Sequence, residues 1–323
     1  MRRVTLPHTN LQVSVMCLGT AELGAYLKGE DAVHLVEEYL NLGGNFIDTA
    51  HCYAFWTPAG AGCSERELGR IIRTLGVREQ VVVATKGGHS AGGADYPRPD
   101  GYMSPEVVAR DLTESLERLQ METVDLYYLH RDDPRVPVDE VIDSLNEHIR
   151  AGRVRAIGAS NWSTGRIEQA NRYASENGLQ GFVISQVQWS LAVPNWKVTA
   201  DPTTRYVTEE DAEWYARHGI PIAAYTATAS GYFAGTQKGE EGFGNPVNAE
   251  RRERARQLAE QLGVSPTQVA LAWLLHQKPA VIPIFATGNL EHLRECMRAV
   301  EVSLSAQQVE WLARGNRRQE GPA

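Results

Sequence analysis

Eight short runs rich in apolar and β-branched residues recur along the chain, and they constrain its fold more than any other feature. The runs lie at 15–19, 45–48, 81–86, 124–130, 154–160, 182–187, 220–225 and 280–285. Their apolar residues do not alternate with polar ones, which is typical of strands buried on both faces of a parallel sheet. Parallel strands need crossover connections, so we expect helices between the runs.

Helix-end signals stand in several of these intervals. Ser64-Glu65-Arg66-Glu67 matches a capping box that would start a helix running toward Leu75. The other signals are an N-cap at Ser104 followed by Pro105, a helix over 137–151 ended by Gly152, a capping box at 265–268 and an N-cap at Asn289. Strands and helices therefore alternate along the whole chain.

This alternation predicts a (βα)8 TIM barrel, with an N-terminal β-hairpin around 3–14 and an extra C-terminal helix near 305–314. No proline-rich linker or change of composition divides the sequence, so we expect a single domain over 1–323. A doubly wound sheet is the competing fold. If it bound a dinucleotide it would usually carry GxGxxG after its first strand, where this chain has LGTAELGA.

Composition excludes several classes of partner. The 32 basic and 40 acidic residues give a net charge of −8, which argues against a nucleic-acid surface. Because the sequence has no long apolar run, we expect no signal peptide and no membrane span. The four cysteines lack CxxC spacing, which predicts free thiols and a cytoplasmic location. His51, Cys52 and Cys63 form no recognised zinc pattern, so no metal is expected.

Polar side chains gather at the ends of the predicted strands. In a (βα)8 barrel these C-terminal ends meet on one rim, where active sites are built. Each buried polar group costs desolvation free energy unless it is paired, so stability alone does not explain the set. The positions are Gly19-Thr20, Asp48, Lys86, His130, Ser160-Asn161, Gln186 and Tyr225-Thr226. We interpret this rim as a candidate active site.

Several segments resemble the aldo-keto reductase family, and the resemblance covers nearly the whole chain. They include NFIDTAHCY (45–53), VVVATKGG (81–88), the run ending in LH at 130, and GRVRAIGASNW (152–162). The resemblance implies a catalytic tetrad of Asp48, Tyr53, Lys86 and His130, and reduction of an aldehyde or ketone by a nicotinamide cofactor. Tyr53 would donate the proton, with its pKa lowered by Lys86, while Asp48 holds the lysine and His130 orients the carbonyl.

The resemblance also implies a cofactor site. Ser160, Asn161 and Gln186 would bind the nicotinamide carboxamide, Tyr225 would stack on its ring, and Gly19 and Thr20 would approach it closely. Thr226, Thr228 and Ser230 stand where the family's pyrophosphate loop begins, but the family's common Y-S-P-L segment is Tyr225-Thr226-Ala227-Thr228 here.

The clearest departure from the family concerns the adenosine 2′-phosphate. The family usually places a Lys or Arg, then Ser or Thr, Arg or Gln, and Glu-Asn after the last strand. This chain has Ala286, Thr287, His292, Glu295 and Cys296 there, and His292 and Arg294 could compensate only in part. Family membership favours NADP(H), and NAD(H) is the alternative.

A second departure follows Tyr53. The interval 54–63 is several residues longer than the family's usual turn and contains Phe55 and Trp56. Together with Trp162 and Trp196, these rings predict an aromatic pocket for a sugar or glycoside. The alternative is a loop that packs its own aromatic side chains under the rim.

Two further functions stay open. One is a sugar-modifying enzyme, an epimerase or a glycoside-cleaving enzyme, that reuses a tightly bound nicotinamide without net consumption. The other is a non-catalytic, nicotinamide-binding regulatory subunit. A small-molecule carbonyl or sugar is the expected partner, and nothing in the sequence indicates the oligomeric state.

Overall fold

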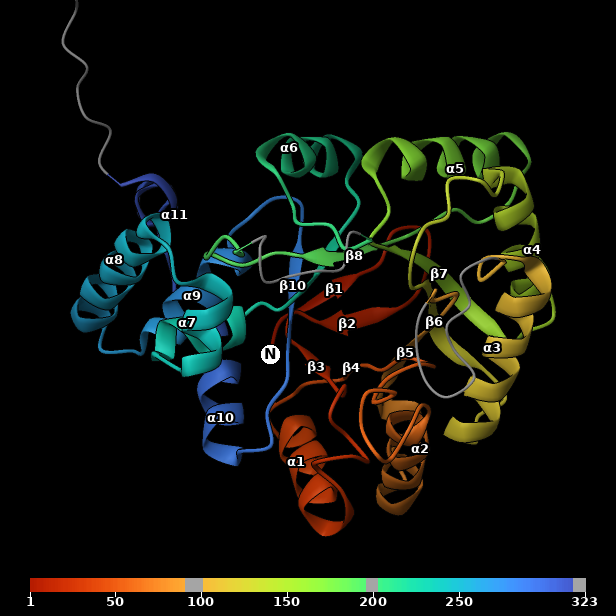
Figure 1. Cartoon of the computed structure of the whole chain (residues 1–323), viewed down its shortest axis with the longest axis horizontal. Coiled ribbons are helices and arrows are strands. Elements are labelled where there is room, and N and C mark those ends of the chain that lie inside the picture. Colours follow the sequence, from red (N-terminus) through yellow and green to blue (C-terminus); the bar gives the residue numbers. More distant parts are fainter. Residues whose placement is uncertain (91–100, 196–202, 316–323) are drawn as a thin grey trace, which may run out of the picture.

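Eight parallel strands form a closed barrel in the order β10-β3-β4-β5-β6-β7-β8-β9 (Figure 1). The computed structural model describes residues 1–90, 101–195 and 203–315. The strands are β3 (Cys17–Gly19), β4 (Phe46–Asp48), β5 (Val82–Gly87), β6 (Val124–Leu129), β7 (Val154–Ser160), β8 (Ser185–Gln188), β9 (Ile222–Tyr225) and β10 (Val281–Phe285). Each apolar run overlaps one of these strands, and their closure into a barrel confirms the predicted (βα)8 fold.

Helices surround the barrel on all sides in the view of Figure 1. They are α1 (Gly29–Asn41), α2 (Cys63–Leu75), α3 (Pro105–Leu119), α4 (Val138–Arg150), α5 (Thr164–Glu176), α6 (Glu209–His218), α7 (Gln237–Phe243), α8 (Pro246–Leu262), α9 (Pro266–Leu275), α10 (Leu290–Arg298) and α11 (Ala306–Arg314). The described residues also form three short 3-10 helices, η1 (Arg78–Gln80), η2 (Ala229–Ala234) and η3 (Ala299–Glu301). Within the described residues, none of these helices has the length and apolar character that a membrane span requires.

The N-terminal hairpin fixes which end of the barrel is available for a site. Strands β1 (Arg3–Thr5) and β2 (Gln12–Ser14) pair antiparallel, as predicted. Leu6, Leu11 and Val13 are buried and pack in one cluster with side chains of the barrel interior, including Phe46 and Ile282. The hairpin therefore covers the end where the strands begin, and the polar C-terminal strand ends lie at the other end.

Most of the predicted helix ends are confirmed, and the exception is informative. Side chains cap α3 at Ser104, α9 at Ser265 and α10 at Asn289, as the sequence predicted. The capping box at Ser64 is wrong, because α2 begins at Cys63 after Gly62, whose backbone is left-handed (φ 80°), and no side chain caps it. The capping-box pattern spans only four residues, so it does not show that the Ser64 hydroxyl binds groups in other parts of the barrel.

Candidate active site

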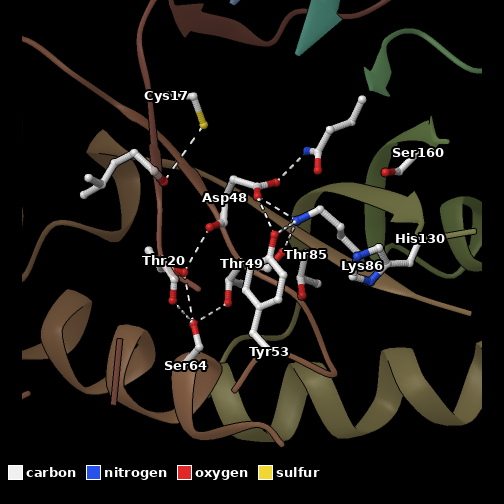
Figure 2. Close-up of polar contacts among 12 residues, drawn as sticks. Cys17, Thr20, Asp48, Thr49, Tyr53, Ser64, Thr85, Lys86, His130 and Ser160 are labelled. Carbon is white, nitrogen blue, oxygen red and sulfur yellow. Dashed lines mark hydrogen bonds and ion pairs between the residues drawn. The ribbon is translucent and has the colours of Figure 1, made fainter. Parts of the chain in front are cut away.

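The four residues of the predicted tetrad meet at the strand ends (Figure 2). Asp48 ends β4, Lys86 lies in β5, and His130 directly follows β6, while Tyr53 lies in the turns after β4. The Lys86 Nζ lies 2.6 Å from Asp48 Oδ2 and 2.8 Å from the Tyr53 hydroxyl oxygen. The Tyr53 hydroxyl is also 3.3 Å from Asp48 Oδ2. The barrel thus joins the lysine, the carboxylate and the phenol in one polar cluster.

Both charges in this cluster are buried, and both are compensated. Lys86 is 0% exposed, and Asp48 is 1% exposed. The third Lys86 contact is to the Thr49 backbone oxygen at 2.7 Å, so the ammonium has three acceptors for its three protons. The other Asp48 oxygen accepts a 2.8 Å hydrogen bond from Gln186 Nε2. Because a buried ion pair is tolerated only when its remaining hydrogen-bonding capacity is met, this network holds the lysine in a single position.

The protonation of Tyr53 differs from the sequence-based expectation. Burial, reinforced by the negative charge of Asp48, raises the pKa of Tyr53 well above its ordinary value. The expected lowering by Lys86 is therefore wrong for the site as it stands, even though Lys86 Nζ is 2.8 Å away. Burial also lowers the pKa of His130 well below its ordinary value, with the neighbouring His89 adding to the effect. At neutral pH the phenol is protonated and the imidazole is neutral.

A cluster of hydroxyl groups braces the strand ends beneath the tetrad (Figure 2). Thr20 Oγ1 donates to the Asp48 backbone oxygen at 2.9 Å, and Ser64 Oγ donates to the Thr20 backbone oxygen at 2.7 Å. The Ser64 hydroxyl is also 3.0 Å from Thr20 Oγ1 and 2.8 Å from Thr49 Oγ1. Ser64, which the sequence placed in a helix cap, instead ties α2 to the loop after β3 and the end of β4. Thr20 remains a predicted cofactor contact.

The predicted nicotinamide contacts lie on the β7–β9 side of the rim. Asn161 has a left-handed backbone (φ 62°), and its Oδ1 accepts hydrogen bonds from the Tyr225 hydroxyl at 2.8 Å and from the Arg205 amide at 3.0 Å. Its Nδ2 donates to Ser160 Oγ at 3.1 Å. These contacts hold Ser160, Asn161 and Tyr225 together in one hydrogen-bonded group. Their roles toward a cofactor stay predictions.

Gly19 has a packing reason to be glycine. A Cβ atom there would lie 3.0 Å from the Ile284 side chain on the adjacent strand β10. Gly19 and Thr20 line one pocket with Ala286, Thr287 and Gly288 of the loop after β10. Two segments predicted to bind the cofactor, at 19–20 and 286–288, therefore line the same pocket although they are far apart in the sequence.

The predicted pyrophosphate segment has an unusual backbone. Thr226, Ala229 and Ser230 all have positive φ, of 55°, 50° and 54° respectively. Non-glycine residues seldom adopt this conformation, and such strain clusters where function requires a particular backbone. Thr228 lies at the start of η2 without a side-chain cap. The binding roles of Thr226, Thr228 and Ser230 stay predictions.

The predicted 2′-phosphate region uses its polar groups internally. Asn289 Oδ1 accepts from the amides of Glu291 and His292, at 2.8 and 3.0 Å, at the start of α10. Thr287 Oγ1 accepts from the Asn289 amide at 3.0 Å and lies 3.3 Å from His292 Nδ1. His292 Nε2 lies 3.8 Å from Glu295.

Arg294, the compensating cation suggested by the sequence, faces another helix. Its Nε lies 2.6 Å from Glu38 Oε1 of α1. The guanidinium is therefore paired with a carboxylate, and a 2′-phosphate would have to compete with Glu38 for it.

The predicted aromatic pocket is supported only in part. The Phe55 and Trp56 rings meet edge to face at 5.1 Å, and Trp56 is 52% exposed beside Tyr53. Trp162 is 1% exposed, donates its indole N–H to the Arg131 backbone oxygen, and packs on Phe182. The structure therefore makes Trp162 a core residue and does not support it as a pocket wall. Trp196 lies outside the described residues.

Two residues beside His130 were not predicted as part of the site. Cys52 Sγ lies 3.5 Å from His130 Nδ1, and the His89 and His130 rings meet edge to face at 4.6 Å. The ligand atoms of Cys52, His89 and His130 lie within 4.8 Å of one another, which is the spacing of a possible metal site in the described chain. The only sequence signal was position, because Cys52 directly precedes Tyr53 and His89 lies two residues after the end of β5.

His51 and Cys63, which stand near Cys52 in the sequence, have other partners. His51 Nε2 lies 2.7 Å from Glu114, while Cys63 Sγ lies 3.6 Å from the Leu23 backbone oxygen. The expected absence of a metal stays a prediction.

Comparisons with known proteins identify the family of this chain. The aldo/keto reductase family model matches residues 15–315. YrpG of Bacillus subtilis, named an uncharacterized oxidoreductase, is 30% identical over 314 residues, which cover 94% of this chain and 92% of that protein. Norsolorinic acid reductase B of Dothistroma septosporum is 29% identical over 330 residues, covering 95% of this chain and 79% of that protein.

A solved structure shows the same fold. The thermostable aldo-keto reductase Tm1743, crystallised with the inhibitor epalrestat, has a TM-score of 0.74 at 24% identity and covers 98% of this chain and 100% of its own. The family model spans the barrel from the start of β3 through α11, including all four tetrad positions. The chain therefore belongs to the aldo/keto reductase family, whose members are NAD(P)H-dependent oxidoreductases that act on carbonyl compounds.

Proposed function

We propose that this protein reduces an aldehyde or ketone, with Tyr53 as the proton donor. The observation that carries the proposal is the buried contact of Tyr53 with Lys86 Nζ at 2.8 Å, where Asp48 and Thr49 hold the ammonium in place. A nicotinamide cofactor, when bound, supplies the hydride that no side chain can provide. The amide, hydroxyl and aromatic groups of Asn161, Ser160 and Tyr225 fit such a cofactor by their donor and acceptor chemistry.

In this mechanism the protein donates the proton that the reaction needs. The carbonyl carbon gains a hydride, and the carbonyl oxygen takes the proton of the Tyr53 hydroxyl as its C=O double bond becomes a C–O single bond. The tyrosinate left behind is stabilised by Lys86 and regains a proton from solvent. His130 donates a second hydrogen bond to the carbonyl oxygen. The raised pKa of Tyr53 means that the proton leaves only when the basic alkoxide develops, so it is not lost beforehand.

The cofactor preference is the finer part of the proposal. The family favours NADP(H), but the contacts described above support NAD(H), because Arg294 is paired with Glu38 and Glu295 lies in the same region. Asn289 also occupies two amides at the start of α10 that could otherwise bind a phosphate. Fluorescence titration with NADH and NADPH tests this preference. Tighter binding of NADH would support NAD(H), and tighter binding of NADPH would restore the family's usual choice.

For the substrate, we propose a sugar or another carbonyl compound with a flat apolar face. Trp56 is exposed and Tyr53 lies next to it, with ring centroids 6.5 Å apart, so a substrate held at the phenol could stack on the indole. Three relatives are named as norsolorinic acid reductases, which is consistent with carbonyl reduction but does not identify this chain's substrate.

One experiment tests the reaction type. The purified protein is mixed with NADH or NADPH and a panel of aldehydes, ketones and glycosides, and cofactor absorbance and product are measured together. Consumption of cofactor in proportion to product supports the reductase. Product without consumption supports the recycled nicotinamide, and neither product nor consumption in the wild type supports the regulatory subunit.

We also propose a single domain over 1–323 in a reducing, cytoplasmic setting, consistent with four free and buried cysteines.

A further inference from the structure

Cys52 contacts a tetrad residue but has no role in the proposed reaction. It lies between Asp48 and Tyr53 in the sequence, is 2% exposed, and places its Sγ 3.5 Å from His130 Nδ1. This distance is within the range of a sulfur hydrogen bond. The edge of the His130 ring also meets His89, with ring centroids 4.6 Å apart and planes at 79°.

The pKa directions of the two partners show whether this contact is neutral or ionic. Burial raises the pKa of the Cys52 thiol to about 12, although Arg131 and Lys86 act in the opposite direction. Burial likewise lowers the pKa of His130 well below its ordinary value, and the charges of His89, Arg131, Lys86 and His51 reinforce that direction. The contact is therefore between a thiol and a neutral imidazole rather than between two ions.

A neutral imidazole has one N–H group and one nitrogen lone pair. When the thiol donates to Nδ1, the ring proton must reside on Nε2. We propose that Cys52 is a positioning residue, whose S–H group donates to His130 Nδ1 and thereby fixes the Nε2–H tautomer. This rests on the proposed function, in which His130 donates a hydrogen bond to the substrate carbonyl, because only a protonated nitrogen can do so.

The alternative use of this cluster is metal binding through Cys52, His89 and His130. A bound cation would lie close to positive charges, because Lys86 and Arg131 both act electrostatically on Cys52 and His130. Like charges raise the free energy of a bound cation, so the thiol–imidazole hydrogen bond is the assignment that the charges favour.

The test is the tautomer of His130 in the full-length, ¹⁵N-labelled protein at neutral pH. Long-range ¹H–¹⁵N correlation spectra distinguish a protonated from an unprotonated ring nitrogen, and His130→Gln identifies the signals. We expect the wild type to carry the proton on Nε2. Cys52→Ala, which removes the donor without adding volume, should populate the Nδ1–H form, and Cys52→Ser should retain the wild-type tautomer. Cys63→Ser is the control, because that thiol lies near the Leu23 carbonyl rather than His130.

The same variants give a kinetic readout. Loss of one weak hydrogen bond that orients the imidazole should lower kcat of Cys52→Ala about three- to tenfold, with unchanged cofactor affinity and rescue in Cys52→Ser. An Nδ1–H tautomer in the wild type, or an unchanged tautomer in Cys52→Ala, would overturn the proposal. The spectra need no turnover, so they remain decisive even if the reductase activity itself is absent.

Discussion

The two sides of the rim differ in how fully their polar groups are fixed. At the ends of β4 and β5, Lys86 and Asp48 are almost fully buried, and each makes hydrogen bonds with several partners. After β10, Arg294 and Glu38 form an ion pair in which the side chains are 44% and 23% exposed. In the proposed reaction, therefore, the buried ion pair supports the chemical step, whereas the exposed loops and helix ends are where cofactor preference can change.

The two ion pairs differ in how much the free energy of unfolding changes when one partner is removed. Removing one partner of a buried ion pair leaves an uncompensated charge in a low-dielectric interior. An exposed pair is screened by water and salt and stabilises the fold by less than about 1 kcal/mol. Substitutions after β10 can therefore alter binding without unfolding the protein, while substitutions at Asp48 or Lys86 affect both activity and stability.

Among substitutions that break an ion pair, the largest effect is expected for Lys86→Met. We expect kcat/KM to fall about 10³-fold, because the tyrosinate loses its cation. The free energy of unfolding should fall by about 3–5 kcal/mol, since Asp48 is left buried without its counter-ion. Steady-state kinetics and urea unfolding measure the two effects. The double variant Asp48→Asn/Lys86→Met should recover much of the stability and none of the activity; recovery of activity would contradict the role of Lys86.

A smaller effect is expected for Glu38→Gln. Releasing Arg294 from its carboxylate should strengthen NADPH binding relative to NADH by about fivefold, because the free guanidinium can pair with a 2′-phosphate. Fluorescence titration of both cofactors measures the ratio. Glu209→Gln is a matched control, because it removes a comparable exposed ion pair with Arg314 elsewhere in the fold. An equal change in both variants would show that Arg294 does not act on the cofactor.

A further effect, on stability alone, is expected from pH. The pKa of His130 is lowered in the folded protein, so the unfolded chain binds more protons between that lowered pKa and about 6.5. The part of the unfolding free energy that depends on neutral His130 is therefore fully present above pH 6.5. It is lost as the pH drops through this window, by at most about 1.4 kcal/mol per pH unit. Urea unfolding at pH 7 and pH 5 should show a smaller decrease in His130→Gln than in the wild type. Equal decreases would mean that His130 titrates normally.

The sequence predicted the features that depend on local pattern. Each buried run overlaps a strand, and the predicted strand ends put Asp48 and Lys86 on one rim. The family resemblance added Tyr53, which the structure places beside Lys86. It failed where distant segments decide the outcome. Ser64 was assigned to a helix cap, but Thr20 and Thr49 provide its partners across the barrel.

The same limit explains the other errors. Trp162 follows the Ser160-Asn161 pair and so was assigned to the substrate pocket, but Phe182 and the Arg131 backbone bury it. The pKa of Tyr53 depends on burial, which no spacing reveals.

The central claim is that Tyr53 delivers the proton in carbonyl reduction, and Tyr53→Phe tests it most directly. Its affinity for the nicotinamide cofactor is measured by fluorescence, and reduction of a carbonyl compound that the wild type accepts is followed by cofactor absorbance. The account predicts that Tyr53→Phe binds the cofactor as tightly as the wild type and reduces the substrate at no measurable rate. Reduction at a rate close to that of the wild type would contradict the account.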